Sequence, residues 1–301
     1  MSRQKFRHTI LKMLGLFSSV RGYNILMVCI AQYLAAIFIL SQRDSVREVV
    51  FDINLLILVV AGALAIAGGY IINGFYDKEK DLINSPLKSM VDRLVGQNTK
   101  LTLYFLLNFI SVIVASYVSF RAVMFFSGYI FLMWFYSHRI KKIVFWGNLT
   151  SAILAIIPFF AVFVYYKNVH TVIFIHALLL FLLILIKELI KDLENLKGDL
   201  VHNYQTIPVK YGENKSKIVI SLVVCVCFSP IYVLLHHFDI GCMYIYIIFV
   251  AISLLFFIIA LWKSNKNRTY VLLHNLLRVI LTIGIFSIML VDMDKLTRIL
   301  F

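Results

Sequence analysis

Two clusters of acidic and amide side chains occur in the sequence, each at the polar end of a long hydrophobic segment. The clusters are Asn73, Asp77 and Asp81, and then Glu188, Asp192, Asn195 and Asp199. Residues three or four apart share one face of an α-helix, so each cluster predicts a helical face that carries oxygen atoms. Seven of the 15 acidic residues in the chain fall within these two stretches. Faces of this kind suit a hard divalent cation and a phosphate-bearing substrate behind it.

Lysines lie among the acids of the second cluster, at Lys187, Lys191 and Lys197. Several carboxylates that face one another repel, and Mg²⁺ relieves this repulsion while it bridges carboxylates to phosphates. The lysines are natural partners for diphosphate oxygens. A diphosphate bound to metal is a good leaving group. We therefore predict Mg²⁺ as the cofactor and a diphosphate as the substrate. An isoprenoid is one candidate for its hydrophobic half, because the chain is rich in aromatic residues, with 25 Phe and 16 Tyr.

The elements that must position these clusters are membrane helices. Hydrophobic residues make up 61% of the 301-residue chain, its mean hydropathy is +0.90, and long apolar runs alternate with short charged segments. We predict an all-α, single-domain protein (residues 1–301) with about nine transmembrane helices in a bundle around a central cavity. Two polar loops, about 77–100 and 188–216, are expected to form its cap. The predicted spans are 22–40, 54–75, 101–119, 122–137, 147–166, 170–187, 217–236, 241–262 and 269–291.

The basic residues follow this nine-span pattern. One side of the membrane receives 22 of the 29 Lys and Arg residues, the other side receives six, and Arg278 lies inside the last span. The positive-inside rule then places the N-terminus and both clusters in the cytoplasm and the C-terminus on the opposite side. We thus expect an integral membrane protein, in the inner membrane if the cell is bacterial. The net charge of +14 reflects this topology, and no nucleic-acid partner is expected, because the basic loops lack interleaved aromatic residues.

Residues 1–21 are predicted to form an amphipathic helix at the membrane interface. Lys12 interrupts the apolar stretch and no small-residue cleavage site follows it. Both features argue against a signal peptide.

Several motifs resemble those of the UbiA superfamily of intramembrane prenyltransferases. The first cluster resembles its N-x3-D-x3-D signature, and Asn84-Ser85-Pro86 resembles the N-x-P that follows. The segment from Lys187 to Asp199 is similar to R-E-x-x-K-D-x-E-D-x-x-G-D. Three other segments carry weaker matches: 21–24, 136–148 (with Lys141, Gly147 and Asn148) and 205–212. Departures from the family pattern are Asn195, where the family usually has Asp, Gly22, where it usually has Pro, Lys88-Ser89, near the usual R-P, and Gln205, where Lys is frequent.

The resemblance implies a cytoplasm-facing active site with two Mg²⁺ ions, a polyprenyl diphosphate donor and a hydrophobic or lipid acceptor beside the membrane. Asp77 and Asp192 are the implied catalytic residues. The expected metal ligands are Asn73, Asp77, Asp81, Glu188, Asp192, Asn195 and Asp199. The implied substrate-binding residues are Arg21, Asn24, Lys141 and Lys191. The residue pattern of the second motif most resembles that of the family branch that prenylates geranylgeranylglyceryl phosphate. A geranylgeranyl group is one candidate for the donor chain.

Arg278 is a further candidate for substrate binding. It lies four residues after His274, so both share a helix face, and an arginine inside a span often marks a functional site. Its possible ligands are an acceptor phosphate or carboxylate, and the alternatives are pairing with a neighbouring helix or snorkelling.

Three other functions remain open from the sequence. One is prenylation of an aromatic quinone precursor. The second is transport, although the acids lie at helix ends and the chain has only four prolines to break its helices. The third is a non-catalytic scaffold, which the Asn195 departure keeps open.

Overall fold

The computed structural model describes residues 15–41, 45–263 and 266–300. Within these ranges the chain forms helices and no strands, and nine segments are long and apolar enough to cross a membrane. They are Gly22–Leu40, Ile53–Tyr76, Gln97–Ser116, Phe120–Lys142, Trp146–Tyr166, Thr171–Glu194, Glu213–His237, Gly241–Lys263 and Asn267–Val291. The predicted all-α membrane fold is confirmed. The interfacial helix predicted over 1–21 lies mostly outside the described residues.

The third and fourth spans separate where the sequence predicts, close to Arg121. Helix α7 (Gln97–Ser116) ends before a short turn, and α8 (Phe120–His138) begins after it. The Ser119 side chain accepts a hydrogen bond from the backbone N–H of Ala122 at 3.1 Å. This N-cap satisfies an amide at the start of α8 that has no partner within the helix.

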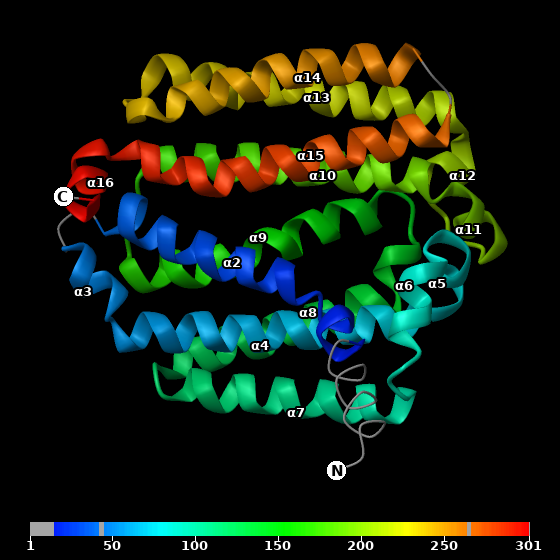
Figure 1. Cartoon of the computed structure of the whole chain (residues 1–301), viewed down its shortest axis with the longest axis horizontal. Coiled ribbons are helices and arrows are strands. Elements are labelled where there is room, and N and C mark those ends of the chain that lie inside the picture. The colour runs from blue at the N-terminus through cyan, green and yellow to red at the C-terminus, as the bar shows by residue number, and fades with distance from the viewer. Residues whose placement is uncertain (1–14, 42–44, 264–265, 301) are drawn as a thin grey trace, which may run out of the picture. The chain divides into compact units, whose positions relative to one another are not determined.

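The chain forms two compact units, and the first holds α4 (Ile53–Tyr76), α7 and α8 side by side (Figure 1). It comprises the described part of Met1–Cys29, together with Ile53–Ile140 and Lys197–Asn203. A Cβ atom on Gly68 would lie 2.5 Å from Asn108 Oδ1, and one on Gly69 would lie 2.0 Å from Met133 Cε. The two glycines therefore allow α7 and α8 to approach α4 closely, as small residues do between membrane helices.

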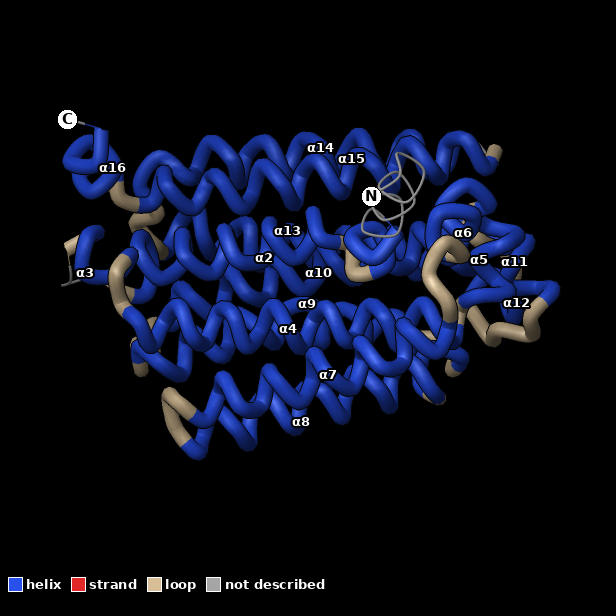
Figure 2. The backbone as a smooth tube through the Cα atoms, turned by 60° about the horizontal axis from the view of Figure 1, so that its bottom comes forward, coloured by secondary structure: helices blue, strands red, loops and turns tan. Residues whose placement is uncertain are grey.

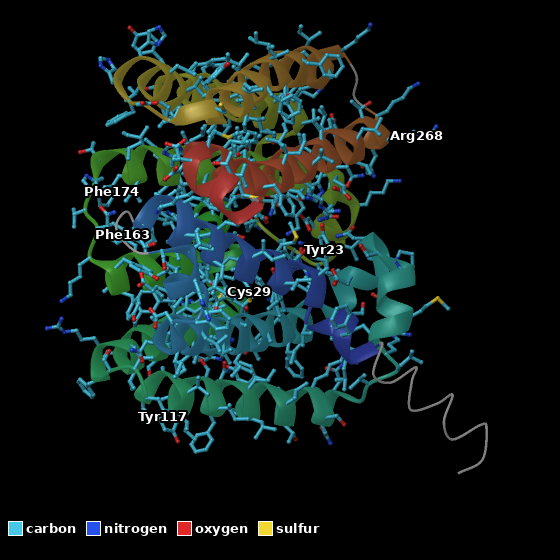
Figure 3. All side chains as sticks on the ribbon, turned by 60° about the vertical axis from the view of Figure 1, so that its left-hand side comes forward. Tyr23, Cys29, Tyr117, Phe163, Phe174 and Arg268 are labelled. Carbon is cyan, nitrogen blue, oxygen red and sulfur yellow. The ribbon has the colours of Figure 1, made fainter. Side chains whose placement is uncertain are left out.

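The second unit comprises the described parts of Ile30–Asp52, Lys141–Leu196 and Tyr204–Phe301. Its long helices are α9 (Trp146–Tyr166), α10 (Thr171–Glu194), α13 (Glu213–His237), α14 (Tyr244–Lys263) and α15 (Asn267–Ser287). Helix α10 packs against α9, α13 and α15 (Figure 2), and it supplies many of the buried side chains of the hydrophobic core. Phe163 of α9 and Phe174 of α10 contact each other edge to face, with ring centroids 5.4 Å apart (Figure 3).

The two polar segments expected as loops contain short helices. They are α5 (Lys78–Asn84), α6 (Pro86–Asp92), α11 (Leu196–Val201) and α12 (Ile207–Tyr211). Helix α10 also continues to Glu194, seven residues past the predicted end of its span at 187. The acids spaced by three and four favour this outcome, because such a spacing gives one polar helix face. The other short elements are α2 (Gly22–Ala35), a π-helix (Ala36–Leu40), α3 (Val46–Val50), 3₁₀-helices (Ile140–Lys142, Gly241–Met243, Ile288–Val291) and α16 (Met293–Leu300).

Candidate active site

The first motif lies where α4 passes into α5 in the first unit. The Asp77 N–H donates to the Asn73 carbonyl at 3.0 Å, and the Asp81 N–H donates to the Asp77 carbonyl at 2.8 Å. The helical repeat thus continues through the junction, and Asn73, Asp77 and Asp81 share one face as predicted. A cleft opens beside this face. Its lining residues are Ser19, Arg21, Tyr70, Asn73, Gly74, Lys78, Asp81, Ser89, Asp92 and Arg93.

Arg21 and Asn24 both reach Tyr70 at this cleft. The Arg21 guanidinium carbon lies 5.0 Å from the centre of the Tyr70 ring, a cation–π distance. Asn24 Nδ2 lies 3.5 Å from the Tyr70 hydroxyl. Tyr70 precedes Asn73 by three residues, so it extends the motif's helix face. The structure therefore brings two predicted substrate residues to the first motif through an aromatic residue that the sequence analysis missed.

Asp92, also at the cleft, is held by residues of its own unit. It accepts a hydrogen bond from Ser19 Oγ at 2.7 Å and forms an ion pair with Lys100, a buried lysine at the start of α7. These contacts fix the segment between α5 and α7. They also balance the charge of one acid beside Arg21, Lys78 and Arg93, so the cleft remains rich in cations.

The end of the second motif belongs to the first unit. Lys80 Nζ lies 2.6 Å from Asp199 Oδ1, and the Asp199 side chain is fully buried. The Gly198 N–H donates to Asn84 Oδ1 at 3.2 Å, and a Cβ atom at position 198 would lie 2.4 Å from that oxygen. The G-D pair of the second motif therefore packs against Lys80, inside the first motif, and against Asn84, just after it.

Glu188 lies on α10 between two lysines. Its Oε1 is 3.1 Å from Lys187 Nζ, and its Oε2 is 3.0 Å from Lys191 Nζ. Buried acids are stable when cations and hydrogen bonds compensate them. Glu188 thus holds Lys191, a predicted diphosphate-binding residue, at the end of α10.

Asp192 accepts a hydrogen bond at 2.8 Å from the side chain of Asn148, which lies at the start of α9. The turn before α9 is tight. Phe145 has a φ of +63°, and the Trp146 N–H donates to the Val144 carbonyl at 2.7 Å, which makes a γ-turn of the rare positive-φ type. Asn148, the last residue of the segment that resembles the family pattern, therefore orients Asp192.

Gly147 and Lys141 belong to the same turn. A Cβ atom on Gly147 would lie 2.8 Å from the Lys141 carbonyl oxygen, so only glycine fits there without a shift of the backbone. Lys141 is buried, and the neighbouring Lys142 carbonyl accepts from the Gln205 N–H at 3.2 Å. The turn thus places Lys141 in the same unit as Asp192.

The last turn of α10 meets α15. His274 Nδ1 lies 2.5 Å from Glu194 Oε2. Arg278, one turn further along α15, is exposed and donates to Asn275 Oδ1 at 3.3 Å. Asn195 directly follows α10, and its N–H donates to the Lys191 carbonyl at 2.9 Å. The sequence placed His274 and Arg278 on one face, but it gave no indication that this face meets the second motif.

Among the described residues, no three His, Cys, Asp or Glu side chains gather as a metal site. This observation is compatible with Mg²⁺, which proteins usually hold through one or two carboxylates together with water and substrate phosphates. The amide and carboxylate oxygens of the Asn73, Asp77 and Asp81 face have the chemistry that Mg²⁺ prefers. The chemistry of these residues therefore fits the ion, which they would hold through their side-chain oxygens.

Comparison with known proteins agrees with this assignment. The family model for the UbiA prenyltransferase family matches residues 16–279. The digeranylgeranylglyceryl phosphate synthase of Methanobrevibacter smithii is 27% identical over 265 residues, which cover 83% of this chain and 88% of that protein. The synthase of the same name from Saccharolobus solfataricus is 30% identical over 227 residues, covering 72% and 78%.

Solved structures show the same fold. A structure of digeranylgeranylglyceryl phosphate synthase has a TM-score of 0.68 at 21% identity, covering 92% of this chain and 97% of that one. A UbiA homologue from Archaeoglobus fulgidus bound to GPP and Mg²⁺ has a TM-score of 0.66 at 13% identity, covering 91% and 99%.

The helical membrane fold and the two acidic motifs thus define an intramembrane prenyltransferase. The chain belongs to the UbiA prenyltransferase family.

Proposed function

We propose that this enzyme transfers a polyprenyl group from its diphosphate to a lipid-phosphate acceptor such as geranylgeranylglyceryl phosphate, in a reaction that depends on Mg²⁺. The observation that carries the proposal is the cleft of the first unit, where Asn73 and Asp81 lie beside Arg21, Lys78 and Arg93. Metal ligands and anion-binding cations in one cleft suit a metal diphosphate. The names of the curated relatives and the wording of the second motif support the acceptor.

Residues of both motifs would bind the metal and the prenyl diphosphate donor. The proposed ligands are Asn73, Asp77, Asp81, Glu188, Asp192, Asn195 and Asp199, with Asp77 and Asp192 essential for turnover. When bound, Mg²⁺ stabilises the negative charge that develops on the departing diphosphate. Lys141 and Lys191 bind diphosphate oxygens, and Arg21 and Asn24 shape the site around Tyr70.

The reaction exchanges one carbon–oxygen bond for another. The bond between the allylic carbon and the diphosphate breaks, and the electron pair leaves with the diphosphate. The acceptor hydroxyl oxygen forms a bond to the same carbon and loses its proton. The positive charge of the allylic carbon in the transition state is stabilised by aromatic faces.

The distribution of basic residues supports a cytoplasmic location for the N-terminus and both motifs, with the C-terminus on the opposite side. Labelling of single cysteines introduced at Lys78 and at Asp239 would test this orientation in sealed vesicles. Protection of the two positions from opposite sides is expected, and protection from the same side would contradict it.

The function is tested with purified protein in nanodiscs and labelled geranylgeranyl diphosphate, with and without Mg²⁺. The acceptor panel includes geranylgeranylglyceryl phosphate, glycerol phosphate, hydroxybenzoate and dihydroxynaphthoate, and mass spectrometry identifies the product. A Mg²⁺-dependent ether product with geranylgeranylglyceryl phosphate is expected. A prenylated aromatic product would replace the proposed acceptor, and a product formed equally without divalent metal would overturn the metal assignment.

A further inference from the structure

The contact between α10 and α15 sets the register of two antiparallel spans. These helices are the sixth and the ninth spans, so they cross the membrane in opposite directions. The 2.5 Å contact between Glu194 and His274 places these two residues at one level. Arg278 therefore lies about one helical pitch, about 5.4 Å, deeper into the span, level with the turn of α10 that carries Lys191.

Arg278 has binding capacity that the described protein does not use. A guanidinium offers five N–H donors, and the one hydrogen bond seen for it within the described residues is the 3.3 Å contact to the neighbouring Asn275. Its side chain is exposed. A permanently charged group at this depth is costly in lipid, and such residues commonly face a polar cavity or a ligand.

Glu194 is the nearest anion to consider, because both Arg278 and Lys191 act on it electrostatically. However, its Oε2 is engaged by His274, whose side chain is 5% exposed. His274 thus holds the Glu194 carboxylate one helical turn away from Arg278. The Arg278 guanidinium makes no ion pair with Glu194.

We infer that Arg278 binds the phosphate of the lipid acceptor, and that His274 is a positioning residue that keeps Glu194 away from Arg278. The inference deepens the proposed function and rests on it. The planar fork of arginine binds a phosphate through two parallel hydrogen bonds. Since Arg278 lies level with Lys191, a phosphate held there brings the acceptor to the second motif. A second source of the same chemistry is the phosphate of an ordinary bilayer lipid, toward which a snorkelling arginine would point.

The direct test measures acceptor binding in nanodiscs without donor. The probes are labelled geranylgeranylglyceryl phosphate and its dephosphorylated alcohol, and the variants are Arg278→Gln and the control Arg268→Gln. Arg268 is an exposed arginine at the start of the same helix (Figure 3). It is not part of the proposed site. We expect Arg278→Gln to weaken binding of the phosphate about 10- to 100-fold and to leave binding of the alcohol unchanged, while Arg268→Gln changes neither.

Each other outcome overturns the inference. Unchanged phosphate binding would mean that Arg278 snorkels to bilayer lipid, and equal weakening of both probes would indicate a structural role. A rise in the KM of the prenyl diphosphate alone would assign Arg278 to the donor. Turnover by the wild-type protein with the phosphate acceptor, run in parallel, separates these results from failure of the proposed function itself.

His274 is tested by rescue. His274→Ala releases Glu194, which is then able to pair with Arg278, so the acceptor KM should rise about 10-fold with a smaller change in kcat. The double variant His274→Ala/Glu194→Gln removes the competing charge and should recover most of the acceptor affinity. If the double variant is as impaired as His274→Ala, the positioning role is wrong.

Discussion

The two motif regions balance their acids in different ways. In the first unit, Asn73 and Asp81 border a cleft whose walls carry Arg21, Lys78 and Arg93. In the second unit, each acid of α10 has its own hydrogen-bonding or ion-pairing partner, and these partners lie on α10 itself, on α9 and on α15. The partners are Lys187 and Lys191 for Glu188, Asn148 for Asp192 and His274 for Glu194.

The difference indicates separate tasks for the two regions. A cleft lined by cations is suited to receive a mobile anion such as a diphosphate. Carboxylates that are oriented by hydrogen bonds need little rearrangement when a ligand arrives, because their positions are already set. The first region is therefore suited to receiving an anion, and the second carries carboxylates whose positions are already set.

Removal of one carboxylate from each region should have the largest effect. Asp77→Ala and Asp192→Ala should each lower turnover at least about 10³-fold, since metal stabilisation of the leaving diphosphate contributes several kcal/mol. Turnover is measured in nanodiscs at matched protein levels. The control is Asp239→Asn, outside both motifs, which keeps the oxygen that accepts from the Gly241 N–H. Full activity of either alanine variant would show that its motif is not required for turnover.

The buried ion pair of the first unit gives the next largest effect. Lys80→Met removes the cation that lies 2.6 Å from the fully buried Asp199, and we expect a loss of about 3 kcal/mol in the free energy of unfolding. Thermal unfolding in detergent measures the change. The double variant Lys80→Met/Asp199→Asn also removes the buried negative charge and should regain much of the stability. No loss in the single variant would show that the pair does not hold this region together.

Asn148 tests whether the second region is preorganised. Asn148→Ala removes the 2.8 Å hydrogen bond to Asp192, and loss of a partner that orients a ligand typically costs about 10- to 100-fold in activity. The rate should fall while the protein remains folded. Asn148→Asp places two acids together, so it should be worse than Asn148→Ala. Equal activity of Asn148→Ala and wild type would contradict preorganisation by this contact.

The smallest predicted effect concerns the turn that carries Lys141. Gly147→Ala places a methyl group 2.8 Å from a backbone oxygen, a clash that should cost about 1–3 kcal/mol of stability. Gly128→Ala is the matched control, because nothing lies within 4 Å of a Cβ atom there, and a small gain is expected from the better helix former. Similar melting temperatures for the two variants would show that the turn adapts to the methyl group.

The fold was largely predictable because long hydrophobic runs, separated by charged segments, are typical of membrane helices. The separation of α7 from α8 at Ser119 and the shared face of Asn73, Asp77 and Asp81 both follow from local periodicity. The spacing of the acids also predicted the helical faces of the two clusters, but the rest of each polar segment was expected as a loop and contains the short helices α6 and α12.

The site was predictable in its residue types and much less so in its contacts. Asn148 and Asp192 are 44 residues apart, and Asn84 and Gly198 are 114 residues apart. Tertiary packing decides such pairs, and no local pattern encodes them. Tyr70 was predictable in part. The sequence shows that Tyr70 lies on the same helix face as Asn73. Its contact with Arg21 depends on the backbone conformation just before α2, which the sequence does not show.

In the proposed function, residues of both motifs hold the same Mg²⁺-dependent prenyl diphosphate. The most direct measurement is the Mg²⁺-dependent binding of a labelled prenyl diphosphate to wild type, Asp77→Ala, Asp192→Ala and the double variant. Because groups that act as one unit are strongly non-additive, we expect each single variant to lose nearly as much affinity as the double. If one single variant binds the diphosphate like wild type, or if the two losses simply add, the motifs do not form a single site.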